Sequence, residues 1–304
     1  MNGICARVLV LMILAPCLLG VSRAQAIPIP MELFREVRPR VLPPPEIPRE
    51  MNGSVRSWVH FFSVSDHQRF DRFMSRGALY RTMVQEVLVE NGVPAELYYL
   101  AMIESGFARG ARSSAKAVGV WQFIAPTARR YGLRVDKEID ERLDIIRGTR
   151  AAARYLKSLK HEFGSWHLAM AAYNCGENCV RRAVRRGHTH DFWQLARMRL
   201  LPVETINYIP KFHAAMLVAR APEVYGFGHK IYYEFPEIHS IRVIGAMPLS
   251  EIARRKHVSF ETLVALNPHL IRRQTPRAGR GYEVWLPRTG PASRITHRSV
   301  AIND

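Results

Sequence analysis

The residue best suited to acid–base chemistry is Glu104, which stands at the end of the apolar run "ELYYLAMIESGFA". A buried acid is costly unless it is paired, hydrogen-bonded or kept neutral. A carboxyl that stays neutral near pH 7 can serve as a proton donor. The alternative is a helix-end glutamate whose carboxylate turns back to water, and the residues around Glu104 must decide between the two.

A dense group of side chains that suit a sugar follows Glu104 along the chain. Tryptophan offers a flat apolar face, and glutamine and asparagine each offer a donor and an acceptor. A cleft lined by such groups fits a sugar, whose ring faces are apolar and whose edges carry hydroxyls. Singly, each residue is more easily explained as structural, with Trp121 in the core and Asn174 as a helix cap. Their joint occurrence favours a sugar site, and the candidates are Ser105, Ser113, Gly119, Trp121, Gln122, Tyr173 and Asn174.

The order and spacing of these motifs resemble one branch of the lysozyme-like lytic transglycosylases of glycoside hydrolase family 23. This branch is the membrane-bound lytic murein transglycosylase D type. The resemblance covers roughly Trp58 to Tyr225, and its motifs are "ESGF", "GVWQF", "TARRYGL", "DERLD", "AAYNCGENCV" and "ETINYIPK". It implies a mainly α, goose-lysozyme-like helical domain. It also implies cleavage of the β-1,4 bond between N-acetylmuramic acid and N-acetylglucosamine in peptidoglycan, with a 1,6-anhydromuramoyl product.

The resemblance also implies roles for single residues. Glu104 matches the catalytic acid and Ser105 its partner, while Tyr208 matches a tyrosine that approaches the acid. The family usually has Ala or Ser where Cys175 stands, which bears on packing or redox sensitivity beside the site. The positions that match substrate-binding residues are Ser105, Ser113, Gly119, Trp121, Gln122, Tyr173, Asn174 and Tyr208.

The mechanism that the resemblance implies needs one carboxyl group, although glycosidases usually use two. Glu104 would protonate the glycosidic oxygen and then, as a carboxylate, take the proton from the C6 hydroxyl of the same sugar. A pKa raised by an apolar surrounding suits both steps. Asp140, Asp144 and Glu177 are more easily explained as helix-end or structural charges. We expect neither a metal ion nor a cofactor.

The 304 residues divide into five predicted parts. Residues 1–26 have the apolar core and Ala24-Gln25-Ala26 pattern of a signal peptide. Residues 27–53 are Pro-rich and are expected to tether the folded part, and residues 54–228 show helical spacing, with an interruption expected near Pro210. Residues 239–288 predict a β-α-α-β unit that resembles a LysM module, either as a sugar-binding domain or as a degenerate copy that only packs against the rest. Residues 289–304 form a polar tail.

Two cysteines, Cys175 and Cys179, remain after removal of the predicted leader. An exported protein can oxidise such a pair, and the spacing permits a bridge only where the local geometry suits it. Free or loosely coupled structural thiols are the expectation.

The leader predicts export to the periplasm or cell envelope, with a lipid anchor at Cys17 as a weaker alternative. The formal net charge of +18 favours an anionic partner, and peptidoglycan glycan strands, the cell-wall surface and the outer membrane all fit. Nucleic acid is disfavoured, although "LSEIARRKHVSFETLVALN" resembles a helix-turn-helix, because the leader and the flanking strands argue against it. The remaining rivals are a hydrolytic lysozyme and a non-catalytic peptidoglycan-binding protein.

Overall fold

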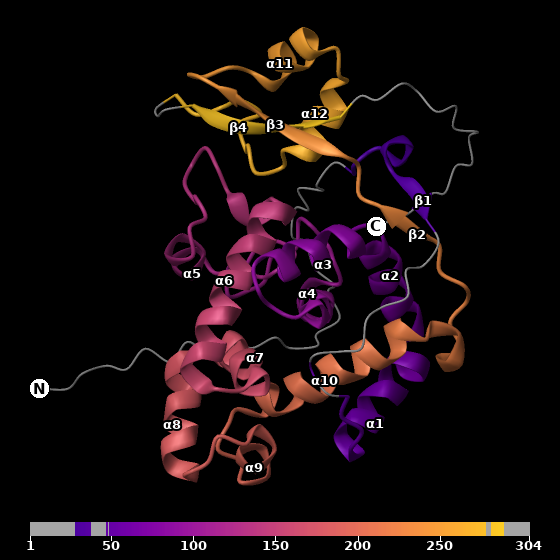
Figure 1. The fold of residues 1–304 in the computed structure, drawn as a ribbon, viewed down its shortest axis with the longest axis vertical. Coiled ribbons are helices and arrows are strands. Elements are labelled where there is room, and N and C mark those ends of the chain that lie inside the picture. Colours follow the sequence, from indigo (N-terminus) through magenta and orange to yellow (C-terminus); the bar gives the residue numbers. More distant parts are fainter. Residues whose placement is uncertain (1–27, 38–46, 48, 278–280, 289–304) are drawn as a thin grey trace, which may run out of the picture.

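The computed structural model describes residues 28–37, 47, 49–277 and 281–288, and over these residues the chain is mainly helical (Figure 1). The predicted leader and tail lie outside the described residues. The helices are α1 Gly53–His60, α2 His67–Ala78, α3 Arg81–Glu90, α4 Tyr98–Ser105, α5 Ala125–Arg130, α6 Ile145–Phe163, α7 Trp166–Cys175, α8 Glu177–Gly187, α9 Phe192–Arg197, α10 Val203–Arg220, α11 Leu249–Lys256 and α12 Phe260–Leu266. The strands are β1 Arg35–Val37, β2 Tyr232–Glu234, β3 Ile238–Val243 and β4 Tyr282–Pro287.

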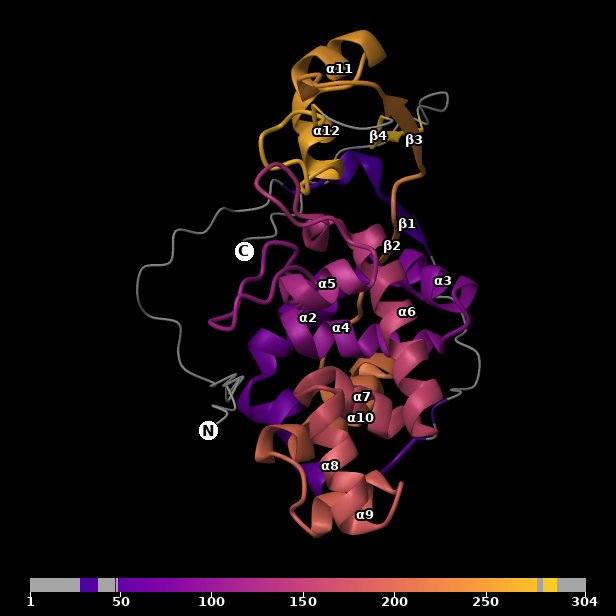
Figure 2. The ribbon, with the colours of Figure 1, turned by 90° about the vertical axis from the view of Figure 1, so that its left-hand side faces the viewer.

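Helix α4 forms the centre of the large helical part, as both ribbon views show (Figure 2). Its residues 98–103 are all buried, so the helix is apolar on every side, as core helices are. Helix α10 packs against α1, α4 and α7, while α6 packs against α3 and α7. The predicted break between α6 and α7 at Gly164-Ser165 is confirmed. The mainly helical fold predicted for this part of the chain is therefore confirmed.

The predicted interruption near Pro210 is wrong, because α10 runs unbroken from Val203 to Arg220 with Pro210 inside it. A proline in a helix interior costs about 3 kcal/mol, since it lacks an N–H and crowds the preceding turn. Ile209 and Phe212, on either side of it, are fully buried between the neighbouring helices. Burying one such side chain is worth roughly 1.5–3 kcal/mol, so tertiary packing outweighs the local penalty.

The described residues of the Pro-rich N-terminal segment pack onto the fold instead of forming only a tether. Strand β1 pairs antiparallel with β2, with Arg35 opposite Glu234. The Phe34 side chain is 5% exposed and meets the ring of Tyr80 edge-on. This segment and the chain leaving α10 therefore close over one side of the helical part.

Residues 238–287 form the predicted β-α-α-β arrangement at the top of Figure 1. Strands β3 and β4 pair antiparallel over their full length, from Ile238 opposite Pro287 to Val243 opposite Tyr282. Helices α11 and α12, which lie between the two strands in sequence, bury apolar side chains against this two-stranded sheet, and the buried set includes Leu249, Ile252, Leu263, Val284 and Leu286. The order of elements is as predicted, while the likeness to a LysM module stays a prediction.

Candidate active site

Glu104 is held in the last turn of α4, at a position where the helix must stop. Gly106 caps the helix with a φ of 56°, in the left-handed region that favours glycine. A Cβ atom at Gly106 would lie 2.2 Å from the ring of Phe73, so no larger residue fits. Arg76 Nε donates to the Gly106 carbonyl oxygen at 2.7 Å and fixes the same turn. The buried helix and its cap therefore set the position of the Glu104 side chain.

The carboxyl group of Glu104 receives a hydrogen bond from Tyr208 of α10, whose hydroxyl donates to Oε1. Removal of the carboxyl from water raises the pKa of Glu104 to about 7. The Tyr208 bond and the positive charge of Lys211 act in the opposite direction, while the negative charge of Glu204 adds to the increase. Near neutral pH, Glu104 therefore exchanges between a proton-bearing and a charged form, as a group that both gives and takes a proton must.

Tyr173 of α7 lies close enough to Glu104 for the two groups to interact. Burial, and then the charge of Glu104, raise the pKa of the Tyr173 phenol well above its ordinary value, so the phenol stays neutral. Its hydroxyl donates to the backbone carbonyl of Trp121 at 2.7 Å. Tyr173 thus joins α7 to the loop that follows Glu104.

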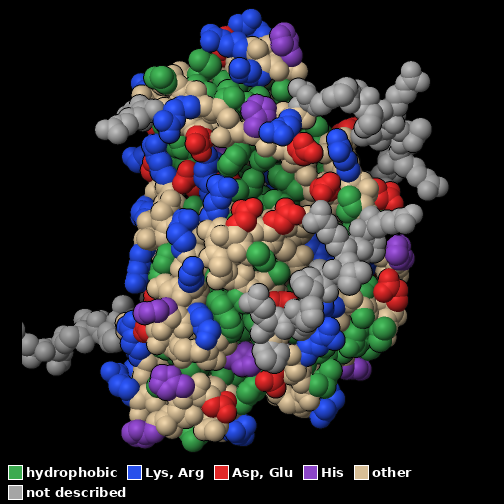
Figure 3. All heavy atoms as spheres, viewed as in Figure 1, with side chains coloured by type: hydrophobic (Ala, Val, Ile, Leu, Met, Phe, Trp, Pro, Cys, Tyr) green, Lys and Arg blue, Asp and Glu red, His purple; other side chains and the backbone are tan. Residues whose placement is uncertain are grey.

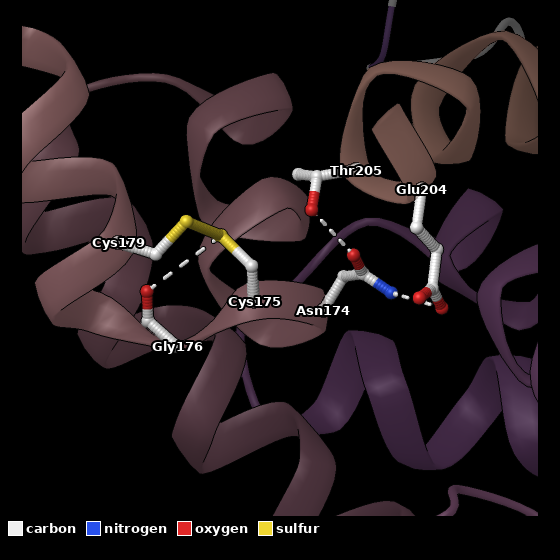
Figure 4. The surroundings of a disulfide bond; sticks show 6 residues. All are labelled: Asn174, Cys175, Gly176, Cys179, Glu204 and Thr205. Atoms are coloured by element: carbon white, nitrogen blue, oxygen red, sulfur yellow. Dashed lines mark hydrogen bonds between the residues drawn. A yellow bond between two sulfur atoms is a disulfide. The ribbon is translucent and has the colours of Figure 1, made fainter. Parts of the chain in front are cut away.

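Asn174, the next residue, links the end of α7 to the start of α10 (Figure 4). Its Oδ1 accepts a hydrogen bond from the Thr205 hydroxyl at 2.7 Å, and its Nδ2 lies 3.5 Å from Glu204 Oε1. The structural alternative for Asn174, a helix cap, does not describe these contacts, and its predicted role in substrate binding stays a prediction. Its side chain spans two helices that both carry site residues.

The expectation of free thiols at Cys175 and Cys179 is wrong, because the two residues form a disulfide. The bond connects the last residue of α7 with α8, across the turn at Gly176 (Figure 4). Gly176 adopts a φ of 85°, which brings the start of α8 back toward the end of α7. The cross-link is thus adjacent in sequence to Asn174.

The loop from Phe107 to Phe123 follows α4, and we call it the site loop. Ser105 ties it to α4, since its hydroxyl donates to the Val120 carbonyl oxygen at 2.8 Å. The Ser105 hydroxyl is thus directed to this loop and not to the Glu104 carboxyl. Gly119 has a φ of 82°, and a Cβ atom there would lie 1.9 Å from the Arg142 carbonyl oxygen. Only glycine allows this approach of the site loop to the segment before α6.

Trp121 is 2% exposed, so its ring lies in the core and presents no open face to a sugar. Its indole N–H donates to the Thr149 hydroxyl of α6 at 2.9 Å. This differs from the predicted role of a flat platform, because the ring is buried and lies against α6. Gln122 has a φ of 48°, a strained conformation of the kind that gathers at functional sites. Its Nε2 donates to the Gly119 carbonyl at 2.7 Å.

Ser113 lies farther along the site loop and bonds to the loop's own backbone. Its hydroxyl oxygen accepts from the Ala117 N–H at 3.1 Å, and its own N–H donates to the Ala117 carbonyl at 3.0 Å. The hydroxyl therefore shapes a turn of the loop. The structure shows no bond from Ser113 to the group formed by Glu104, Tyr208 and Tyr173.

The charges predicted to be structural are confirmed as such for three carboxylates. Asp140 accepts from the Arg142 backbone and forms a two-bond ion pair with that guanidinium, at 2.8 Å for each bond. Asp144 caps the start of α6 by accepting from the backbone of Ile146 and Arg147 at 2.9 Å. Glu177 begins α8 and pairs with an arginine of α5. Within the described residues, no group of three or more His, Cys, Asp or Glu is placed to hold a metal ion.

Sequence reasoning missed Lys211 and Glu204, whose charges act on Glu104. Lys211 lies three residues after Tyr208 on α10, so the two share a helix face. Its Nζ lies 5.2 Å from the ring centre of Trp58 in α1. Both residues stand in "ETINYIPK". The interruption expected near Pro210 placed Tyr208 and Lys211 in different helices, so their shared helix face was not predicted.

Comparison with known proteins identifies the segment that carries this group. Residues 84–196 match the family described as "Transglycosylase SLT domain". This segment is therefore similar to a transglycosylase SLT domain. This match confirms the predicted lysozyme-like fold class and the predicted resemblance, while Tyr208 and Lys211 lie beyond the matched residues. The SLT domain therefore depends on α10, which follows it in sequence, for the groups that act on Glu104.

Curated relatives match a longer stretch that includes the SLT domain. The chain is 33% identical over 183 residues to the "Membrane-bound lytic murein transglycosylase D" of Escherichia coli strain K12, and equally to that of strain CFT073. These matches cover 59% of this chain and 40% of each relative. A "Putative tributyltin chloride resistance protein" of Alteromonas sp. strain M-1 is 38% identical over 103 residues, which cover 34% of this chain and 49% of that protein. The chain thus spans less than half the length of these relatives.

Proposed function

We propose that the protein is a peptidoglycan lytic transglycosylase. It cleaves the β-1,4 bond between N-acetylmuramic acid and N-acetylglucosamine and leaves a 1,6-anhydromuramoyl end. The observation that carries the proposal is the carboxyl of Glu104, with its pKa near 7 and its bond from Tyr208, inside an SLT domain. The Escherichia coli relatives are named as lytic murein transglycosylases.

In the proposed mechanism, Glu104 acts first as an acid and then as a base. It protonates the glycosidic oxygen, while the acetamido group of the muramoyl sugar assists from the other face of the ring. The resulting carboxylate takes the proton from the C6 hydroxyl, and the C6 oxygen bonds to C1. Tyr208 supports both states, because its hydroxyl holds the carboxyl in place and stabilises the charge between the two proton transfers.

Substrate binding is assigned, as part of the proposal, to polar side chains of α7 and of the site loop. Tyr173, Asn174 and Gln122 supply hydroxyl and amide groups for the sugar edges, while Ser105, Ser113, Gly119 and Trp121 shape the site loop. This division is supported by burial, since Trp121 is enclosed by the core whereas Tyr173 and Asn174 are half-buried. Tyr173 is bonded to the site loop and Asn174 to α10, the helix that also carries Tyr208.

The proposed setting is the cell envelope, with the anionic cell-wall surface or outer membrane as the surrounding partner. Lys and Arg side chains gather along one edge of the molecule, over α5 and α6 (Figure 3). Arg129, Arg130, Arg150, Arg154 and Lys157 are exposed there. Such an edge attracts an anionic polymer or surface. No helix within the described residues has the length and apolar character needed to cross a membrane.

A hydrolytic muramidase is the second candidate, and Glu204 is the observation in its favour. A hydrolase needs a second carboxylate to activate water or to act as nucleophile. Glu204 is close enough to raise the pKa of Glu104. Its position beside Asn174 and at the start of α10 gives it a structural role in the proposed mechanism.

Two isosteric variants separate these candidates. Glu104→Gln should lower turnover of purified peptidoglycan by about a hundred- to ten-thousand-fold, the usual worth of acid–base catalysis. Sedimentation with insoluble peptidoglycan should stay near the wild-type level. Glu204→Gln should keep turnover within a few-fold of wild type. Normal release of anhydro products by Glu104→Gln contradicts the proposal. Comparable loss of turnover in Glu204→Gln and in Glu104→Gln supports the two-carboxylate hydrolase.

A further inference from the structure

The β-α-α-β unit is joined to the helical part by a buried polar network. Asp144 accepts hydrogen bonds from Trp285 Nε1 of β4 at 2.7 Å and from Arg147 at 2.5 Å through the same carboxylate oxygen. The Asp144 side chain is 2% exposed. The Arg147 guanidinium lies over the rings of Tyr282 and Trp285, 5.2 and 4.9 Å from their centres. These groups face each other across the junction between the two parts, and we call this junction the docking interface.

A second hydrogen-bonded pair, Tyr282 with Glu141, extends the docking interface toward residue 134. The Tyr282 hydroxyl donates to Glu141 Oε1 at 2.6 Å, and the other oxygen of Glu141 accepts from the Arg134 backbone at 2.7 Å. Glu141 is 8% exposed. A buried carboxylate left without its donors costs far more than a surface ion pair is worth. Loss of Tyr282 or Trp285 as a donor therefore weakens the docking interface, because it takes a hydrogen bond away from the buried carboxylate of Glu141 or Asp144.

Backbone hydrogen bonds also join the segment before α6 to the β-α-α-β unit. The Asp140 N–H donates to the His269 carbonyl at 2.9 Å, and the Ile271 N–H donates to the Glu138 carbonyl at 3.1 Å. Ile139 pairs with Leu270 between these two bonds. The Ile139 side chain is fully buried in the core of the β-α-α-β unit. The segment before α6 thus contributes a strand-like edge and a core residue to the unit formed by residues 238–287.

This same segment holds the site loop through Arg142. Its guanidinium donates to the carbonyl oxygens of Lys116 and Phe123, each at 3.1 Å, while Asp140 holds it from the other side. The Arg142 carbonyl is the group that meets Gly119. The unit that docks on Asp140 therefore acts, through Arg142, on both ends of the turn that contains Gln122.

A separate contact reaches the site loop directly. Arg109 follows Glu104 by five residues and is 8% exposed. Its Nη1 donates to the Ala265 carbonyl of α12 at 2.8 Å. The site loop is thus fixed to the β-α-α-β unit near its start and, through Arg142, near its end.

We propose that the β-α-α-β unit is a fixed part of the active-site framework, and that Tyr282 and Trp285 are positioning residues that act on the site loop through Glu141, Asp144 and Arg142. The proposal rests on the proposed function for its catalytic consequence only. A domain that swings on a linker to capture sugar would not bury charged groups against the catalytic part. The unit instead keeps the site loop, and with it Gln122, in a fixed relation to Glu104.

The test uses the full chain with the double change Tyr282→Phe and Trp285→Phe, which removes two donors and leaves an aromatic ring at each position. Tyr233→Phe is the matched control, because its ring packs in β2 against Phe34, away from the docking interface. Hydrogen exchange of the amides in residues 116–123 is the first measurement. The double variant should exchange there at least about three- to tenfold faster than wild type, because opening of this part of the site loop becomes easier by at least the worth of one net hydrogen bond. The control should exchange at the wild-type rate.

The second measurement is turnover of a soluble peptidoglycan fragment, well below the temperature at which either variant unfolds. The double variant should lose about three- to a hundredfold in kcat with little change in KM, because a shift of the order of 1 Å in a site can cost about a hundredfold. Wild-type exchange in residues 116–123 overturns the proposal, whatever the activity. Faster exchange with wild-type kcat overturns the positioning role. If the wild-type chain itself shows no turnover, the proposed function is wrong. The hydrogen-exchange comparison still tests whether the docking interface fixes the site loop.

Discussion

The raised pKa of Glu104 has a thermodynamic consequence that does not depend on any substrate. A pKa of about 7 in the folded chain, against the ordinary 4.5, means that ionised Glu104 opposes folding by about 3 kcal/mol. The direction follows from proton binding, because between pH 4.5 and 7 the folded chain holds this proton and the unfolded chain has lost it. Stability from this group is therefore full below pH 4.5, is lost as the pH rises through 7, and changes no further above that.

Glu104→Gln removes the charge and keeps the oxygen that accepts from Tyr208. The variant should match wild type in stability near pH 4 and exceed it by up to about 3 kcal/mol at pH 8. Urea unfolding followed by circular dichroism at pH 4, 6 and 8 measures the difference at each pH. The variant should also show the large loss of turnover given above at every pH, so that the stability gain and the activity loss come from one group. Equal stability of the two proteins at pH 8 refutes the reasoning, since it means that Glu104 is charged at little cost.

Two further sets of variants follow from the same geometry. Lys211→Met removes a positive charge that lowers the pKa of Glu104, so the loss of kcat/KM at alkaline pH should move to higher pH. Glu204→Gln removes a negative charge that raises this pKa, so the same loss of kcat/KM should move to lower pH. The same direction of movement in both pH–rate profiles contradicts this electrostatic account. Gly119→Ala should destabilise the chain by at least about 2 kcal/mol and lower kcat, because it adds a clash with a backbone oxygen to the strain of a positive φ. Gly164→Ala has the same strain with open space around it, so it should cost about 1 kcal/mol in thermal unfolding and leave kcat unchanged.

Much of the fold followed from local patterns in the sequence. The end of α3 at Asn91-Gly92, the break between α6 and α7, and the order of elements from β3 to β4 were all predicted from periodicity and from Gly and Pro signals. The candidate Glu104 was also found this way, because the apolar run before it becomes the buried helix α4. Tyr208 was found through the motif resemblance, and the structure brings it to the Glu104 carboxyl.

What the sequence did not predict depends on contacts between distant segments. Pro210 stays helical because neighbouring helices bury its turn, and no local rule contains that packing. The charges of Lys211 and Glu204 become relevant only when α10 lies against α4. The docking interface joins residues near 140 to residues near 285, and its carboxylates looked like ordinary helix-end charges. The Cys175–Cys179 bond depends on the angle at which α8 leaves α7, which spacing alone does not give.

The mass of the cleaved glycan ends tests the single-acid mechanism most directly. Purified peptidoglycan should be digested by the wild-type chain in water enriched in heavy oxygen, and the muramoyl ends analysed by mass spectrometry. The mechanism predicts ends lighter by one water than hydrolysed ends and without heavy oxygen, because the C6 hydroxyl of the sugar is the nucleophile. Full-mass ends that carry heavy oxygen would contradict it and would show that water completes the reaction.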